Sequence, residues 1–170
     1  MNHVALLIGG NQGDRRELIN HATALIQQRI GTVALFSRTY ETEPWGEFEA
    51  ESGERRVENF LNRALLVETT LTAHEVLHEA LAIEADLGRV RADTSLHSAP
   101  CTRIYHSRPM DIDLIFFNDE VIDTPDLTIP HPRMHLRRFV LEPLAEIIPD
   151  YRHPLIGKTV RELLDDLDEQ

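Results

Sequence analysis

The chain has 170 residues and a formal net charge of -12; 42% of its residues are hydrophobic and 27% are charged. This composition is ordinary for a soluble globular protein, and the length suits one domain with its own core, which we expect to span residues 1–170. The acidic balance argues against nucleic acid or an anionic membrane as a partner, because both require a basic face.

Signals for export or membrane insertion are not found in the sequence. No apolar run is long enough to span a bilayer, and the N-terminus lacks the basic start of a signal peptide. The single cysteine, Cys101, cannot form an intramolecular disulfide, which is typical of the reducing cytosol. We therefore expect a cytoplasmic protein.

The N-terminal part of the chain predicts a strand, a turn and a helix. Residues 4–8 are continuously apolar and lead into a glycine-rich stretch at 9–14. This stretch lacks the spacing of a dinucleotide-binding loop, so its glycines are predicted to form a tight reversal. Asp14 can cap the helix that follows, and Gly31 can end it. The predicted buried stripe of this helix is Leu18, Ala22, Leu25 and Ile26.

Two further strands are predicted before the next helix. Residues 33–42 are rich in β-formers, and residues 60–69 alternate between apolar and polar side chains. Between them, residues 47–58 are polar and acidic and predict a surface loop. Phe60 and Asn62 share one face of the later strand, where they could hold a flat heterocycle by stacking and hydrogen bonds. Core packing around a satisfied Asn62 is the alternative.

A helix is predicted from Thr70 or Thr72 to Leu87, with Gly88 as its stop. It contains His74 and His78 in the H-E-x-x-H pattern of zinc hydrolases. At helical spacing, however, both histidines project almost opposite the buried stripe, so a zinc hydrolase is only the alternative interpretation. Glu84 lies at the border of the stripe, where either a partner arginine or a nucleotide contact could explain a carboxylate.

The stretch that carries most of the chemistry is residues 107–117, Ser-Arg-Pro-Met-Asp-Ile-Asp-Leu-Ile-Phe-Phe. Strand alternation predicts that Asp111 and Asp113 share one face, with Cα atoms about 6–7 Å apart. Phe117 is expected on the aspartate face, and Phe116 on the opposite one. Two like charges on an apolar strand favour hard divalent cations, and Mg²⁺ commonly binds one or two carboxylates together with substrate phosphates. A solvated edge strand is the alternative.

The segments on either side of this strand also bear on function. Residues 89–107 form a long stretch with few periodic apolar positions, and its three arginines and Tyr105 predict a lid over phosphates. Residues 127–133 are expected to be extended by their prolines. A helix interrupted by Pro143 is predicted over residues 137–148, and a last amphipathic helix over 159–167.

Six motifs occur in an order that resembles one enzyme family over nearly the full length of the chain. They are G-G-N-Q-G-D at 9–14, Y-E-T-E-P-W-G at 40–46, F-L-N at 60–62, E-x3-G-R-V-R at 84–91, R-x2-D-I-D at 108–113 and I-P-H-P-R at 129–133. The chain is similar to the 6-hydroxymethyl-7,8-dihydropterin pyrophosphokinases of folate biosynthesis. This resemblance implies a ferredoxin-like α+β sandwich, and we expect the chain to act as a monomer. It also implies ATP as donor, two Mg²⁺ ions, and transfer of pyrophosphate to the pterin with release of AMP.

The resemblance further implies a role for individual residues. Asp111 and Asp113 would bind the metal ions and, with Arg89 and Arg108, form the catalytic set. The implied pterin pocket consists of Thr42, Pro44, Trp45, Phe60, Asn62 and Phe139. The implied ATP site consists of Glu84, Arg89, Arg91, Arg103, Tyr105, Arg108, Leu114, Thr128, His131 and Arg137.

The sequence departs from the family pattern mainly in the predicted lid. Ile104 stands where a basic residue is expected, so Arg103 would substitute for it, and Tyr105 replaces a common tryptophan. The segment between Arg91 and Arg108 is also longer than usual, and Gly10 replaces a usual serine. A catalytically silent pterin- or nucleotide-binding relative is a second alternative, but the presence of both aspartates and of the arginine set argues against it.

Overall fold

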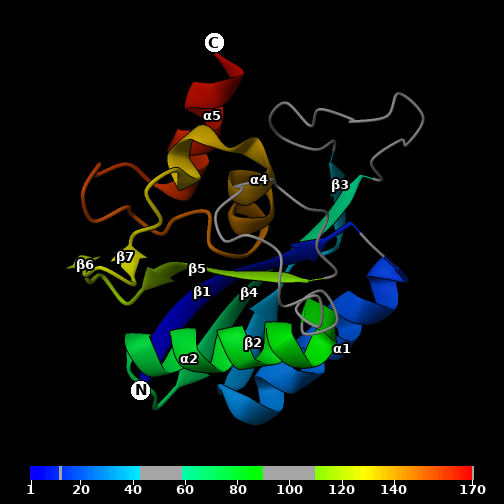
Figure 1. The fold of residues 1–170 in the computed structure, drawn as a ribbon. Coiled ribbons are helices and arrows are strands. Elements are labelled where there is room, and N and C mark those ends of the chain that lie inside the picture. The colour runs from blue at the N-terminus through cyan, green and yellow to red at the C-terminus, as the bar shows by residue number, and fades with distance from the viewer. Residues whose placement is uncertain (12, 43–58, 90–109, 170) are drawn as a thin grey trace, which may run out of the picture.

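The computed structural model describes residues 1–11, 13–42, 59–89 and 110–169, and it is built around one antiparallel sheet (Figure 1). The order of its strands is β2-β4-β1-β5, with β3 also paired to β4. The strands are β1 (Asn2–Gly10), β2 (Thr32–Phe36), β3 (Tyr40–Thr42), β4 (Phe60–Thr69) and β5 (Asp111–Phe117). All four pairings are antiparallel.

Helices cover both faces of this sheet and confirm the predicted α+β architecture (Figure 1). One face packs against α1 (Arg15–Arg29) and α2 (Ala73–Glu84), and the other against α4 (Arg138–Ile147) and α5 (Val160–Asp168). The remaining short elements are η1 (Ala85–Arg89), β6 (Ile122–Asp123), β7 (Thr128–Ile129) and η2 (Met134–Leu136). Among the described residues, no helix has the length and apolarity needed to cross a membrane.

The helices begin where the predicted caps stand. The Asp14 carboxylate accepts a hydrogen bond from the Glu17 backbone N–H at 3.2 Å, at the start of α1. Thr72, rather than Thr70, caps α2 through a reciprocal capping box with Glu75. Gly88 interrupts the helical run inside η1 with a φ of 129°, a conformation that favours glycine.

The glycine-rich stretch differs from the prediction. Gly9 and Gly10 do not form a tight reversal, because both belong to β1, which continues two residues beyond the predicted end at Ile8. The turn comes later, at Gly13, whose φ is 66°. The predicted strand at 33–42 is likewise divided into β2 and β3, and Pro143 lies inside α4 without ending it.

The end of β5 also corrects the sequence prediction. Phe116 packs under α4 and α5, whereas Phe117 packs with the α1–α2 cluster, so the two rings lie on faces opposite to those expected. The cause is a register shift in the pairing of β5 with β1: Leu6 pairs with Leu114, but Ala5 pairs with Phe116. Such a bulge inserts one residue and reverses the alternation beyond it.

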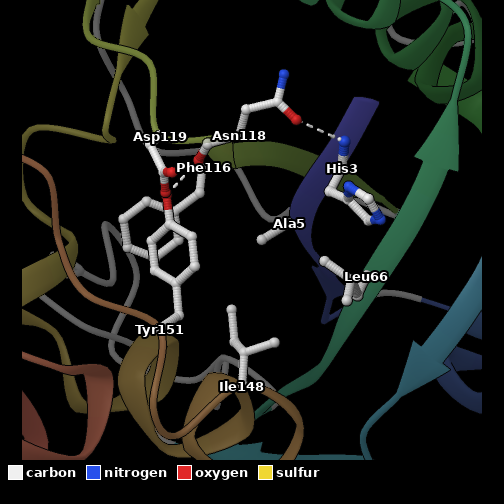
Figure 2. Close-up of a pocket in the computed structure, with 8 residues that line it drawn as sticks. All are labelled: His3, Ala5, Leu66, Phe116, Asn118, Asp119, Ile148 and Tyr151. Carbon is white, nitrogen blue, oxygen red and sulfur yellow. Dashed lines mark hydrogen bonds between the residues drawn. The ribbon is translucent and has the colours of Figure 1, made fainter. Parts of the chain in front are cut away.

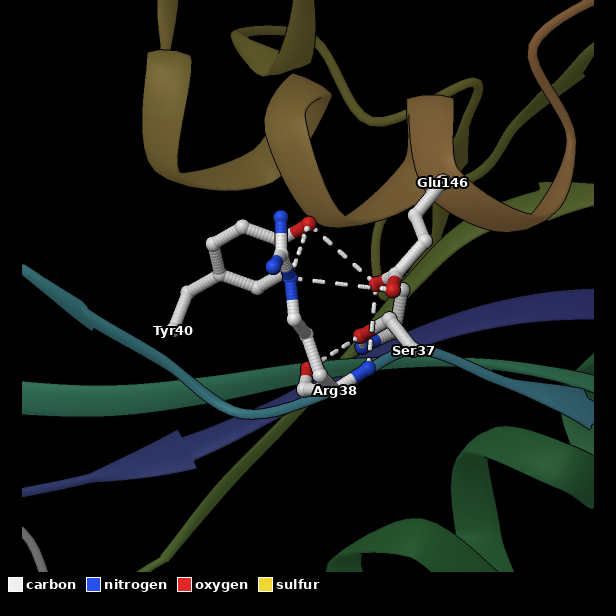
Figure 3. A network of polar contacts seen from close by, with 5 residues as sticks. Ser37, Arg38, Tyr40 and Glu146 are labelled. Atoms are coloured by element: carbon white, nitrogen blue, oxygen red, sulfur yellow. Dashed lines mark hydrogen bonds and ion pairs between the residues drawn. The ribbon is translucent and has the colours of Figure 1, made fainter.

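A polar network joins α4 to the segment between β2 and β3 (Figure 3). The Glu146 carboxylate accepts hydrogen bonds from the Arg38 backbone N–H at 3.0 Å and from the Tyr40 hydroxyl at 3.2 Å. The buried Ser37 hydroxyl accepts from the Ala64 backbone N–H at 2.9 Å and donates to the Arg38 carbonyl at 2.7 Å. The network therefore fixes α4 relative to β3 and β4.

Gly9 provides a test of the packing at the centre of the sheet. A Cβ added there would lie 2.3 Å from Asn62 Oδ1 and 2.6 Å from the Leu61 carbonyl oxygen. The amide could rotate away, but the carbonyl belongs to the β4 backbone and can move only with the strand. We expect Gly9→Ala to lower the free energy of unfolding by about 1–3 kcal/mol in chemical denaturation. A variant as stable as the wild type would contradict this close approach.

Candidate active site

The central strand β1 brings the predicted site residues of two other strands together. Gly9 pairs with Asn62 of β4 on one side and with Asp111 of β5 on the other. Asp113 pairs with Leu7, whose side chain belongs to the cluster under α4 and α5. Because alternate residues of a strand share a face, the amide and both carboxylates lie on the α4 side of the sheet.

The aspartate pair has the arrangement predicted from alternation. Asp111 and Asp113 are half-buried, whereas Ile112 and Leu114 between and beyond them are buried on the opposite face, in the α1–α2 core. Within the described parts of the chain, no group of three or more His, Cys, Asp or Glu side chains could hold a metal ion. Two carboxylates with phosphate or water as the other ligands are a set that suits Mg²⁺.

Glu84 contacts the backbone of the aspartate strand. Its side chain is 2% exposed, and its Oε1 atom accepts a hydrogen bond from the Ile112 backbone N–H at 2.8 Å. Glu84 is the last residue of α2, so this contact joins the end of the helix to the start of β5. The sequence suggested either a partner arginine or a nucleotide contact for Glu84, and neither interpretation included a contact with the backbone. The place of Glu84 in the ATP site stays a prediction.

The described part of the predicted pterin pocket lies around Asn62. Its side chain is buried, and its Nδ2 atom donates a hydrogen bond to the Thr42 hydroxyl on β3 at 3.0 Å. On β1, Gly9 leaves room for the other end of this amide, since a Cβ there would lie 2.3 Å from Asn62 Oδ1. Phe60 lies two residues earlier on β4 and therefore faces the same side of the sheet. Asn62 thus has a fixed orientation next to an aromatic ring.

Positive charge collects at the N-terminal end of α4. Arg137 is the residue before this helix, and the first helical turn contains no acidic residue. The guanidinium carbon of Arg137 lies 5.6 Å from the centre of the Phe139 ring. A helix N-terminus carries a partial positive charge, so an arginine there makes the end attractive to an anion. Arg137 and Phe139 are therefore placed to serve a phosphate and a ring side by side.

His131 lies between this positive end and the aspartates. Its backbone N–H donates a hydrogen bond to the Ile115 carbonyl of β5 at 3.0 Å, after the cis peptide bond between Ile129 and Pro130. Burial, assisted by the charge of Arg137 and opposed by that of Asp111, lowers the pKa of His131 to about 4. At neutral pH the imidazole is thus uncharged and can still donate one hydrogen bond.

The other predicted residues are only partly covered by the structure. Leu114 is buried in the α1–α2 core, Thr128 is exposed on β7, and the backbone of Arg89 closes η1. Six predicted residues lie outside the described parts, together with the predicted lid: Pro44, Trp45, Arg91, Arg103, Tyr105 and Arg108. The sequence prediction missed the place of Gly9 in the site. The only sequence feature that could have indicated it is a glycine pair directly after an apolar strand.

The zinc alternative finds no support at its two histidines. Both His74 and His78 are exposed on α2. His74 Nε2 lies 3.1 Å from the Thr124 hydroxyl and 3.3 Å from an oxygen of Asp126. An exposed imidazole with these neighbours is explained as a surface contact between α2 and the β6–β7 connection.

A cavity of about 320 Å³ lies on the α4 side of the sheet, near the start of β1 (Figure 2). The residues that line it are His3, Ala5, Leu66, Phe116, Asn118, Asp119, Ile148 and Tyr151. None of the predicted site residues is among them. Since Asn62 and Asp111 pair with Gly9 at the other end of β1, this cavity is separate from the candidate active site.

Comparisons with known proteins match most of the chain. The family model for 7,8-dihydro-6-hydroxymethylpterin-pyrophosphokinase (HPPK) matches residues 5–149. The 2-amino-4-hydroxy-6-hydroxymethyldihydropteridine pyrophosphokinase of Porphyromonas gingivalis is 37% identical over 89% of this chain and 93% of its own length. The enzyme of the same name from Bacillus subtilis is 40% identical over 86% of this chain and 79% of its own.

Solved structures support the fold. A crystal structure of an HPPK-DHPS in complex with substrates superposes with a TM-score of 0.71 at 18% identity. The match covers 99% of this chain but 44% of that one, so the present chain corresponds to less than half of the longer protein. A Plasmodium falciparum HPPK-DHPS triple mutant gives a TM-score of 0.71 at 17% identity, over 97% of this chain and 43% of its own. The sheet with helices packed on it is accordingly a ferredoxin-like α+β fold. The chain belongs to the 7,8-dihydro-6-hydroxymethylpterin-pyrophosphokinase family.

Proposed function

We propose that this chain transfers pyrophosphate from ATP to 6-hydroxymethyl-7,8-dihydropterin in folate biosynthesis, giving AMP and the pterin diphosphate. One geometric observation supports this most directly: Asn62 and Asp111 both pair with Gly9, from opposite sides. Two strand spacings therefore separate their backbones, about 10 Å. A bicyclic ring held at Asn62 could reach the phosphates held at the aspartates.

The pterin site is proposed around the fixed amide of Asn62. An amide offers both a donor and an acceptor to the edge of a heterocycle, and aromatic rings stack on its faces. Phe60 and Phe139 would stack on the two faces of the pterin. Thr42, Pro44 and Trp45 would line the rest of the pocket, as the resemblance implies.

The triphosphate is proposed to lie between β5 and the N-terminus of α4. Arg137 and neutral His131 would donate hydrogen bonds to its oxygens from the described side of the site. Arg89, Arg91, Arg103, Tyr105 and Arg108 would close over it from the segment that follows α2. Leu114 and Thr128 would lie near the nucleoside.

Asp111 and Asp113 would hold two Mg²⁺ ions. Both are hard oxygen donors on one half-buried face, which fits these ions when phosphate and water complete the shell. When bound, the ions would neutralise phosphate charge and lower the pKa of the pterin hydroxyl. We assign no side chain as general base.

The chain's own residues would then act by positioning and by charge. The pterin hydroxyl oxygen bonds to the β-phosphorus, the bond from that phosphorus to the oxygen retained by AMP breaks, and the hydroxyl proton passes to water. Asn62 and the stacked rings hold the hydroxyl in line. Arg89 and Arg108 stabilise the negative charge that develops on AMP and on the transferred group.

We further propose that residues 1–170 act as one monomeric domain in the cytoplasm. The single Cys101 suits a reducing compartment, and the net charge of -12 disfavours nucleic acid as a partner. A size measurement in solution tests the oligomeric state independently of the reaction.

The proposed reaction is tested by an AMP-release assay with ATP and the pterin. We expect stoichiometric AMP and pterin diphosphate with Mg²⁺, and neither product when the metal is chelated. ATP and pterin binding without AMP release would instead identify a catalytically silent binding protein.

Asp113→Ala should lower turnover by at least about 100-fold, because it removes one of the two metal-binding carboxylates. The variant should remain folded, since the change also relieves repulsion with Asp111. Asp123→Ala is the matched control, because Asp123 is exposed on β6. Near-normal product formation by Asp113→Ala would refute the metal assignment.

Arg108→Ala should lower kcat by about 100-fold or more while leaving the affinity for pterin nearly unchanged, because the arginine is assigned to phosphate charge. Steady-state kinetics and pterin binding by calorimetry separate these effects. Arg161→Ala, at an exposed position of α5, controls for the loss of an arginine. An effect confined to pterin affinity would contradict the assignment.

His131 predicts an acid sensitivity of the folded state. Its pKa is lowered from 6.5 to about 4, so between these values the unfolded chain binds a proton that the folded protein does not. The free energy of unfolding should therefore fall as the pH drops from 7 to 5, and less so in His131→Gln. Denaturation at both pH values measures this difference. An NMR titration of His131 with a midpoint near 6.5 would contradict it.

A further inference from the structure

We propose that Glu84 is a positioning residue: through the Ile112 backbone N–H it holds Asp111 and Asp113 in the geometry needed to bind a metal–nucleotide complex. The inference rests on the proposed function, because it assumes that the two aspartates bind the metal. It differs from the role implied by resemblance, since it requires only an oxygen acceptor at residue 84 and not a negative charge beside the nucleoside.

The burial of Glu84 calls for a specific interaction. Its side chain is 2% exposed, and taking a carboxylate out of water is costly unless hydrogen bonds replace the lost hydration. The hydrogen bond of 2.8 Å from the Ile112 N–H offsets part of this cost.

The geometry of the ladder explains why this N–H is available. In an antiparallel pair, the backbone groups of successive residues point alternately toward the partner strand and away from it. The bond to Glu84 shows that the Ile112 N–H points away from β1, so the backbone groups of Asp111 and Asp113 point toward β1. Each aspartate is thus fixed to the sheet on one side, and Glu84 fixes the residue between them on the other.

The anchor lies where the strand needs it most. β5 is the last strand in the sheet order and begins at Asp111, directly after the segment that the structure does not describe. Strand ends open more readily than strand centres. A displacement of about 1 Å at a reacting centre can cost about 100-fold in rate, so a frayed Asp111 would weaken metal binding strongly.

Substitutions of Glu84 separate an acceptor role from a charge role. Glu84→Gln keeps an oxygen acceptor of similar size without the charge, whereas Glu84→Met fills similar space without an acceptor. We expect Glu84→Gln to require a Mg²⁺ concentration within about 3-fold of wild type for half-maximal activity, and Glu84→Met one at least about 10-fold higher. The KM for pterin should stay unchanged in both. Glu79→Met is the matched control, because Glu79 lies on α2 and pairs with Arg29.

A second measurement needs no catalysis. Amide hydrogen exchange at Ile112, followed by NMR in the ligand-free protein, should be faster in Glu84→Met than in wild type, with Glu84→Gln close to wild type. Calorimetry with Mg²⁺ and a non-hydrolysable ATP analogue should follow the same order.

Three outcomes would overturn the proposal. One is that Glu84→Gln is as defective as Glu84→Met, which would mean that the charge is required. The others are normal Mg²⁺ dependence in Glu84→Met, or Ile112 exchange unchanged in that variant. Failure of the wild-type protein to release AMP would refute the proposed reaction, whereas the exchange and calorimetry would still decide the role of Glu84.

Discussion

Two carboxylates held side by side on one strand are the constraint around which the site is built. Asp111 and Asp113 project from the same half-buried face of β5, and their repulsion is relieved only where positive charge collects nearby. The N-terminal end of α4, with Arg137 in front of it, provides such charge across the same face. The anionic pair and the cationic helix end therefore define a place for a polyanion that carries its own metal ions.

Much of this arrangement could be predicted from local sequence patterns. Alternation put Asp111 and Asp113 on one face, and Asp14, Thr72 and Thr159 mark helix starts because their short polar side chains accept from the first turn. The bulge that exchanges the faces of Phe116 and Phe117 could not be predicted, because it depends on how β5 pairs with β1. Long-range pairing leaves no periodic signal in either strand.

The same limit applied to two residues of the candidate site. Gly9 was expected in a turn, because a glycine pair after an apolar run is a common turn signal. The need for a residue without a side chain at this position arises only when β4 pairs with β1 and brings Asn62 and the Leu61 carbonyl close to it. Glu84 could be recognised as an unusual carboxylate on a buried stripe. Its partner could not be recognised, since every residue except proline has a backbone N–H and the sequence does not show which of them lies near Glu84.

The position of each strand in the sheet explains why its site residues are held differently. β4 lies between β1 and both β2 and β3, so hydrogen bonds to neighbouring strands fix its backbone on both sides and Asn62 needs only side-chain contacts to set its orientation. β5 has β1 as its sole ladder partner in the described part of the chain. Its outer edge is instead met by Glu84 at Ile112 and by the His131 backbone at Ile115. The backbone of this edge strand is thus held on its outer side by single contacts, whereas the backbone of an interior strand is held on both sides by neighbouring strands.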